Sequence, residues 1–75
     1  MPHVIVKMYK GRTDEQKKML AEGIRETLVR TIGAGEAHIS VSVEDYDPAD
    51  WHTVEAAEID GKPESLYMKA GRLVK

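Results

Sequence analysis

The chain has no cysteine, no phenylalanine and only one tryptophan among its 75 residues. The absence of cysteine excludes both a disulfide framework and a zinc site with thiolate ligands. Its 11 basic residues are scattered among 13 acidic ones, which argues against a nucleic-acid partner. No apolar run is long enough to cross a membrane, and the first residues do not resemble a signal peptide. We therefore expect no membrane partner and a cytoplasmic location.

A chain of this length forms one small domain, and we treat residues 1–75 as a single unit. A domain of this size buries only about 60% of the surface that its unfolded chain exposes, so its own core is marginal. Because disulfides cannot supplement that core, association with copies of itself is the expected source of further stability. The composition leaves small molecules and protein partners, including a second copy, as candidate ligands.

Two segments alternate between apolar and polar residues, which is the pattern of a half-buried β-strand. The first segment covers His3–Tyr9 and the second covers His38–Glu44. Their apolar positions are Val4, Val6, Met8, Ile39, Val41 and Val43. We predict that each segment is a strand with one apolar face.

The segment between these strands carries the start and stop signals of a helix. Thr13-Asp-Glu-Gln16 matches a capping box, so the helix should begin at Asp14. The Gly33-Ala-Gly35 sequence predicts its end. An apolar stripe repeats at every fourth position, formed by Leu20, Ile24, Leu28 and Ile32.

Two strands joined by a long helix predict a β-α-β unit in which the strands are parallel and the helix covers their apolar face. The fold class is therefore α+β. The other face of the strands mixes apolar and polar residues and has no predicted cover within the chain. Since parallel strands are normally covered on both faces, we expect another subunit to complete the sheet.

The last third of the chain is less regular. Asp47 followed by Pro48 predicts a helix start that leads to Trp51. The segment Pro63–Ala70, followed by Gly71, predicts a short helix, and the last four residues form a tail that pairs or frays. Trp51 has two interpretations, as an ordinary packed residue or as the wall of a pocket.

Pro2 follows Met1 directly and leads into the first strand. An initiator methionine is commonly removed before a small residue such as proline, and its removal leaves Pro2 with a free secondary amine. Such an amine is a candidate general base. The alternative is that Pro2 only begins an edge strand, where its missing N–H does no harm.

Together these features resemble the 4-oxalocrotonate tautomerase family. The resemblance rests on Pro2, the two alternating strands, the long helix, Trp51 and the segment Gly11-Arg12-Thr13-Asp14-Glu15-Gln16-Lys17. It implies a tautomerase/MIF-like fold and a keto–enol tautomerase that needs neither a cofactor nor a metal. The C-terminal segment is more similar to the dimeric branch of the family, whose members act on phenylpyruvate-like enols. A homodimer is therefore favoured, and a hexamer is the alternative.

The resemblance also implies roles for particular residues. Pro2 takes the role of general base, and Arg12 matches an arginine that binds a substrate carboxylate and that, placed near Pro2, would lower the pKa of its amine. The alternative for Arg12 is a solvated loop residue. Trp51 matches an aromatic wall, and Tyr9 lines the same pocket from a neighbouring subunit or packs in the interface.

Ser40 departs from the family pattern, because the founding enzymes carry a second arginine at this position. A neutral hydroxyl stabilises an enolate oxygen less than a guanidinium does. His38 and Lys7 are candidate sources of the missing charge. The departure argues against a dicarboxylate and favours an arylpyruvate-like 2-oxo acid or enol, held by Arg12 and Trp51.

Two other functions stay open. One is hydration or dehalogenation on the same scaffold, with water activated by one of the acidic residues Glu44, Asp45 and Glu55. The other is a non-catalytic oligomeric binding module. The three histidines lack the spacing of metal ligands, so we expect no metal site.

Overall fold

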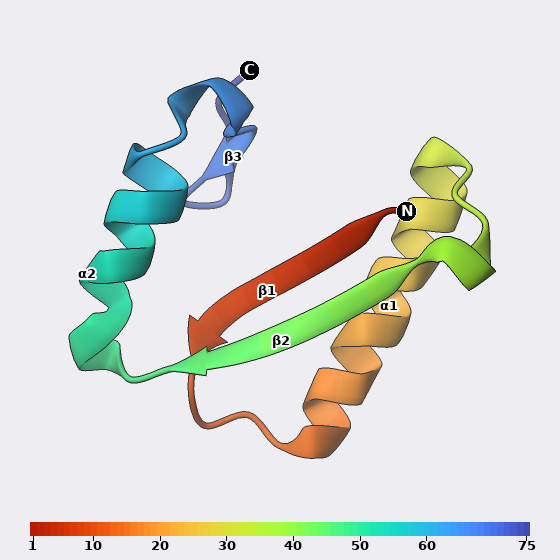
Figure 1. Ribbon diagram of the computed structural model, residues 1–75, viewed down its shortest axis with the longest axis horizontal. Helices are drawn as coiled ribbons and strands as arrows, with labels where there is room; N and C mark the ends of the chain where they lie inside the picture. The colour runs from red at the N-terminus through yellow and green to blue at the C-terminus, as the bar shows by residue number, and fades with distance from the viewer.

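The computed structural model describes every residue from Met1 to Lys75. Two parallel strands, β1 (His3–Tyr9) and β2 (Ser40–Tyr46), lie side by side, and α1 (Asp14–Ile32) connects them (Figure 1). The predicted β-α-β unit of an α+β fold is confirmed. The second strand begins two residues later than predicted, because η1 (Glu36–His38) is a short 3-10 turn.

The register of the two strands places their apolar positions opposite each other. Val4 pairs with Val41, and Val6 pairs with Val43. Paired residues of neighbouring strands project from the same face, so these valines form one apolar surface. Helix α1 covers this surface as predicted. Its residues that form a groove with Val4 are Met19, Leu20, Gly23, Ile24, Thr27 and Leu28.

Both predicted ends of α1 are confirmed. The Thr13 hydroxyl accepts the Gln16 N–H at 3.1 Å, and the Gln16 side-chain oxygen accepts the Thr13 N–H at 2.9 Å, which completes the capping box. At the other end Gly33 adopts φ 67°, in the left-handed region that favours glycine. No helix of the chain, α1 included, has the length and apolarity of a membrane span.

Residues 47–75, called the C-terminal arm below, form a second region on the opposite side of the sheet from α1 (Figure 1). Its helical part consists of η2 (Pro48–Asp50), α2 (Trp51–Val54) and a π-helical segment, η3 (Glu55–Asp60). Asp47 caps this part as predicted, since its carboxylate accepts the Ala49 N–H at 3.1 Å. The first turn is a 3-10 turn, so the α-helix itself begins only at Trp51.

The predicted helix over Pro63–Ala70 is wrong. Only its first residues are helical, and the segment then forms a hairpin. These elements are η4 (Pro63–Ser65), β3 (Met68–Lys69) and β4 (Arg72–Leu73). Ala70 and Gly71 have φ values of 50° and 78°. Two left-handed residues in a row make a hairpin turn and cannot continue a right-handed helix, so Gly71 belongs to a turn rather than to a helix end.

Very little of the chain is fully buried, and only Val54 is as little as 5% exposed. The accessible surface is 5824 Å². A compact protein of 8.4 kDa is expected to expose about 4,600 Å². The single chain therefore exposes more surface than a self-contained domain of its mass.

Candidate active site

Pro2 and Ser40 lie together at the amino ends of the two strands. The Ser40 N–H donates to the Pro2 carbonyl at 3.1 Å, and this bond holds Pro2 at the start of β1. Pro2 is half-buried, whereas Met1 is 97% exposed. Removal of Met1 therefore uncovers no packed surface.

His3 contributes a polar contact that the sequence analysis missed. Its Nδ1 lies 2.6 Å from Ser40 Oγ. The register pairs His3 with Ser40, so both side chains project from the same face of the sheet. The sequence contains a signal for this contact. When the apolar faces of the two strands are aligned, His3, which precedes Val4, lies opposite Ser40, which precedes Val41. The chain has no cluster of three His, Asp or Glu side chains that would hold a metal ion.

Tyr9 and Trp51 meet at the other end of the sheet, where the strands have their carboxyl ends. Their ring centroids lie 5.2 Å apart with an interplanar angle of 81°. The ring of Tyr46 lies 6.4 Å from that of Trp51, at 80°. Edge-to-face contacts of this kind are favourable. Tyr9 therefore contacts the Trp51 of its own chain.

A cavity of about 400 Å³ opens beside Trp51, between the sheet and the C-terminal arm. It is lined by Ile5, Lys7, Trp51, Val54, Glu58 and Ile59. Its volume and its mostly apolar lining are typical of small-molecule pockets. The arm thus covers part of the face for which we expected another subunit. The rest stays open, and Ile5 is 52% exposed.

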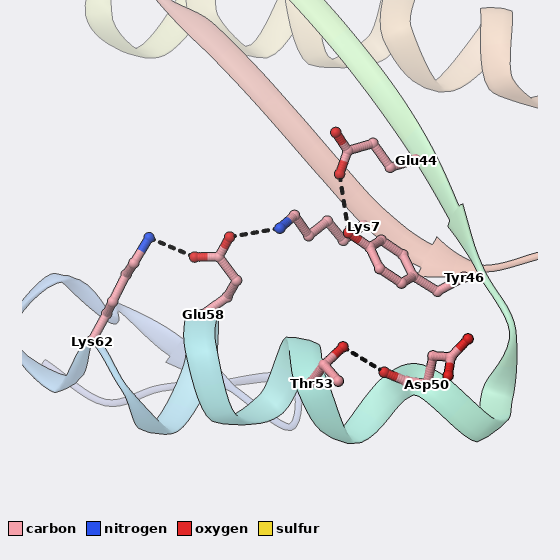
Figure 2. Close-up of polar contacts among 7 residues, drawn as sticks. All are labelled: Lys7, Glu44, Tyr46, Asp50, Thr53, Glu58 and Lys62. Atoms are coloured by element: carbon pink, nitrogen blue, oxygen red, sulfur yellow. Dashed lines mark hydrogen bonds and ion pairs between the residues drawn. The ribbon is translucent and has the colours of Figure 1, made fainter.

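The charged groups of this cavity are paired with each other. Lys7 reaches from β1 to Glu58, and Lys62 approaches the other oxygen of the same carboxylate (Figure 2). The two N–O distances are 2.8 Å and 2.5 Å. Lys62 and then Lys7 lower the pKa of Glu58 to about 2, and Glu58 raises the pKa of Lys7. Lys7 is therefore already paired and is not a free cation that could replace an arginine at Ser40.

His38, the other candidate for that charge, lies in η1 and makes no side-chain hydrogen bond. Its ring lies beside Gly35. The structure thus brings His3, rather than His38 or Lys7, into contact with Ser40.

Arg12 lies in the exposed loop between β1 and α1. It takes part in none of the ion pairs of the chain. Its guanidinium is therefore free to bind an anion from outside the chain, and its planar fork suits a carboxylate.

A single chain keeps the predicted site residues in two groups. Pro2 and Ser40 lie at the amino ends of the strands, whereas Tyr9 and Trp51 lie at the carboxyl ends, with Arg12 just beyond them. The seven residues of β1 separate the two groups by roughly 20 Å, at about 3.3 Å per residue. The expectation that Arg12 is a cation close to Pro2 is therefore wrong within one chain.

The comparison with protein families agrees with this fold. Residues 2–55 match the family described as "Tautomerase enzyme". The chain therefore belongs to the tautomerase family and is an isomerase.

Curated relatives are similar over nearly the whole chain. Tautomerase PptA of Klebsiella pneumoniae (strain 342) is 38% identical over 72 residues, which are 95% of this chain and 96% of the relative. Tautomerase PptA of Shigella sonnei (strain Ss046) is 32% identical with the same coverage of both chains.

Solved structures are similar over a smaller part. YwhB, a homologue of 4-oxalocrotonate tautomerase, superposes with a TM-score of 0.60 and 48% identity over 61% of this chain and 75% of its own. TomN, a 4-oxalocrotonate tautomerase homologue in the tomaymycin biosynthetic pathway, gives a TM-score of 0.64 and 26% identity over 67% of this chain and 77% of its own. These neighbours share the β-α-β fold.

Proposed function

We propose that this tautomerase interconverts the keto and enol forms of an arylpyruvate-like 2-oxo acid, with Pro2 as the general base. The observation that carries the proposal is the hydrogen bond from the Ser40 N–H to the Pro2 carbonyl. It fixes Pro2 in place behind a single, exposed residue. In the chain that has lost Met1, the Pro2 nitrogen is a secondary amine in a defined position. In a chain that keeps Met1, this nitrogen is an amide without a basic lone pair.

The proposed reaction needs Pro2 in its neutral form. A free α-amine titrates at about 8 and a secondary amine somewhat higher, so the site must lower this pKa. Apolar surroundings and a nearby cation both do so. Neutral Pro2 then takes the proton of the enol hydroxyl. The resulting ammonium delivers a proton to the adjacent carbon, which yields the keto acid and regenerates the amine.

The substrate class follows from Arg12 and Trp51. The unpaired Arg12 binds one carboxylate in a bidentate manner. Trp51 and the apolar cavity beside it accommodate an aryl group. Ser40 is neutral and supplies no second cation beside Arg12. A substrate with one carboxylate is therefore favoured over one with two.

The proposed site is shared between two copies of the chain. Arg12 and Trp51 lie roughly 20 Å from Pro2 along β1, so they reach a Pro2 only in another subunit. The accessible surface exceeds that of a compact chain by about 1,200 Å². One partner of a standard interface buries about 800 Å², so the excess is sufficient for a dimer. A homodimer is the simplest assembly with such sites, and native mass measurement distinguishes it from a hexamer.

Substitution of Pro2 tests the proposed base. The Pro2→Ala variant should ketonise phenylenolpyruvate at least about 100-fold more slowly, which is the lower range of what a general base contributes. Intact mass measurement of both proteins confirms that Met1 is absent from the chains that are compared. Undiminished turnover by the variant would exclude Pro2 as the base.

Mixing two variants that each lack one residue of the site, assayed at a substrate concentration well below the KM of Arg12→Ala, tests whether the site is shared. Arg12→Ala should mainly raise KM, because it removes the carboxylate anchor. When Pro2→Ala and Arg12→Ala chains are unfolded together and refolded at equal amounts, half of the dimers are mixed, and each has one intact site. Activity should return to about one quarter of the wild-type value in a two-fold symmetric dimer. Failure to recover above the sum of the separate variants would place Arg12 and Pro2 in the same chain's site.

A further inference from the structure

We propose that His3 and Ser40 together form the hydrogen-bond donor that stabilises the enolate oxygen while Pro2 transfers the proton. This inference rests on the proposed function, because the oxygen belongs to the enolate that Pro2 generates. It assigns a role in the reaction to two side chains on the two strands.

The position of the pair follows from two contacts of the same serine. The Ser40 backbone N–H binds the Pro2 carbonyl at 3.1 Å, and Ser40 Oγ lies 2.6 Å from His3 Nδ1. His3 is also the next residue after Pro2. The pair is therefore held beside the proposed base by the ladder of the sheet itself.

The hydrogen bond within the pair leaves one donor free in either arrangement of its protons. When the Ser40 hydroxyl donates to His3 Nδ1, the neutral imidazole carries its hydrogen on Nε2. When Nδ1–H donates to Ser40 Oγ, the hydroxyl hydrogen of Ser40 points elsewhere. An N–H or an O–H is thus available to a substrate oxygen in both tautomers.

Ser42 on this face is unbonded but lies two residues further along β2, and the remaining polar side chains of the face lie nearer its carboxyl end. Lys7 is paired with Glu58 at 2.8 Å, and the Tyr46 hydroxyl donates to Glu44 at 3.3 Å (Figure 2). His3 and Ser40 are both exposed, so a substrate can reach them. The amino end of the sheet therefore offers this pair as its donor.

The donor acts on the rate of the chemical step rather than on binding. As Pro2 takes the hydroxyl proton, the O–H bond breaks and its electron pair gives the enolate, whose carbon then accepts the proton from the ammonium. The oxygen carries most negative charge between these two transfers. A hydrogen bond to it is stronger then than in the bound enol, so its loss should lower kcat more than it changes KM.

The test compares His3→Ala, Ser40→Ala, the double variant and Ser40→Thr in ketonisation of phenylenolpyruvate. Each alanine variant should lower kcat about 10- to 100-fold with a KM change below about threefold. Removal of a buried oxyanion donor lowers kcat about 100- to 1,000-fold. The loss expected here is smaller, because water reaches the pair. The double variant should be no slower than the slower single variant, since the two side chains act as one unit. Ser40→Thr keeps the hydroxyl and should keep most of the activity.

Ser42→Ala is the matched control, because Ser42 is the next serine on the same face of β2 and its side chain makes no hydrogen bond. Its kcat should equal that of the wild type. Circular dichroism checks that each variant is folded. Nitrogen NMR gives a second measurement, in which Ser40→Ala should shift the His3 Nδ1 resonance.

Three results would overturn the inference: single variants within about twofold of the wild-type kcat, losses that multiply in the double variant, or an unmoved Nδ1 resonance. The Pro2→Ala variant, measured in the same assay, distinguishes failure of the donor role from failure of the proposed function. If Pro2→Ala is inactive while the pair variants are unaffected, only the donor role is wrong. If Pro2→Ala retains full activity, the base and the donor that serves it are both wrong.

Discussion

The β-α-β unit and the C-terminal arm of this chain are held together by different interactions. The β-α-β unit has a seven-residue ladder between β1 and β2 and a 19-residue helix with both ends capped. The elements of the arm have two to six residues each. Solved tautomerase neighbours cover 61% to 67% of this chain, whereas PptA relatives cover 95% of it. The fold shared with those structures is therefore smaller than the whole chain, although the sequence similarity to PptA extends into the arm.

The arm is attached through ion pairs, aromatic edges and the buried side chain of Val54. Lys10 pairs with Asp47 at 2.8 Å, Lys7 pairs with Glu58 at 2.8 Å, and Trp51 contacts Tyr9. Exposed ion pairs contribute little to stability, about 0–1 kcal/mol each. We therefore expect the arm to open at a lower free energy than the β-α-β unit unfolds. Three substitutions test this difference.

The largest effect is expected from Ile24→Ala in α1. Ile24 is half-buried and lines the groove beside Val4, so its truncation should lower the free energy of unfolding by about 2 kcal/mol. Urea denaturation followed by circular dichroism measures this loss. Ile32→Ala is the matched control, since Ile32 is 64% exposed on the same helix and should change stability by less than about 0.5 kcal/mol. Equal losses in both variants would show that α1 does not stabilise the unit through its sheet-facing side.

A smaller and local effect is expected from Glu58→Gln, which removes both ion pairs of the carboxylate. The folded pKa of Glu58 is about 2, below its ordinary value of 4.5. Lys62, the larger cause, lies within the arm, so only the part of this lowering that comes from Lys7 favours the attached arm; that part is present at neutral pH and is lost as the pH falls towards 2. Fluorescence of Trp51, the only tryptophan, should report opening of the arm in this pH range in the wild type.

In Glu58→Gln the fluorescence of Trp51 should already be shifted at neutral pH. It should also lose the part of its pH dependence that titration of Glu58 causes. Glu64→Gln is the matched control, because the Glu64 carboxylate takes part in no ion pair. If Glu58→Gln and the wild type titrate identically, the ion pairs do not hold the arm.

The smallest effect is expected from Ala70→Asn in the terminal hairpin. Ala70 has a φ of 50°, which asparagine tolerates better than alanine, and Asn-Gly is a favoured hairpin turn. The substitution should stabilise the hairpin by about 0.5 kcal/mol, whereas Gly71→Ala should destabilise it. Hydrogen exchange of the Val74 N–H, which donates to the Tyr67 carbonyl at 2.8 Å, measures the change. A matching change in global unfolding would show that the arm and the unit unfold together.

The sequence predicted the β-α-β unit well because its signals are local. The alternation of the strands and the capping box at Thr13 depend only on neighbouring residues. The terminal hairpin was missed because glycine both ends helices and forms turns, and because Ala70 gives no sign of its left-handed conformation. Propensity alone could not distinguish these two structures at Gly71.

For the site, residue types were more informative than positions. Pro2 and Arg12 are ten positions apart in sequence, but an extended strand carries them to opposite ends of the sheet. The contact between His3 and Ser40 depends on the register of two distant strands. It becomes predictable only when the apolar faces of both strands are aligned first.

The length of β1 has a consequence for how activity depends on protein concentration. When the base lies at one end of this strand and the carboxylate anchor at the other, a lone chain holds no complete site. Turnover per chain then follows the assembled fraction and declines on dilution below the dissociation constant of the assembly. For a dimer far below that constant, doubling the amount of chain raises the total rate about fourfold by mass action. In that range, a higher concentration of the chain raises the activity of each chain as well as the number of chains.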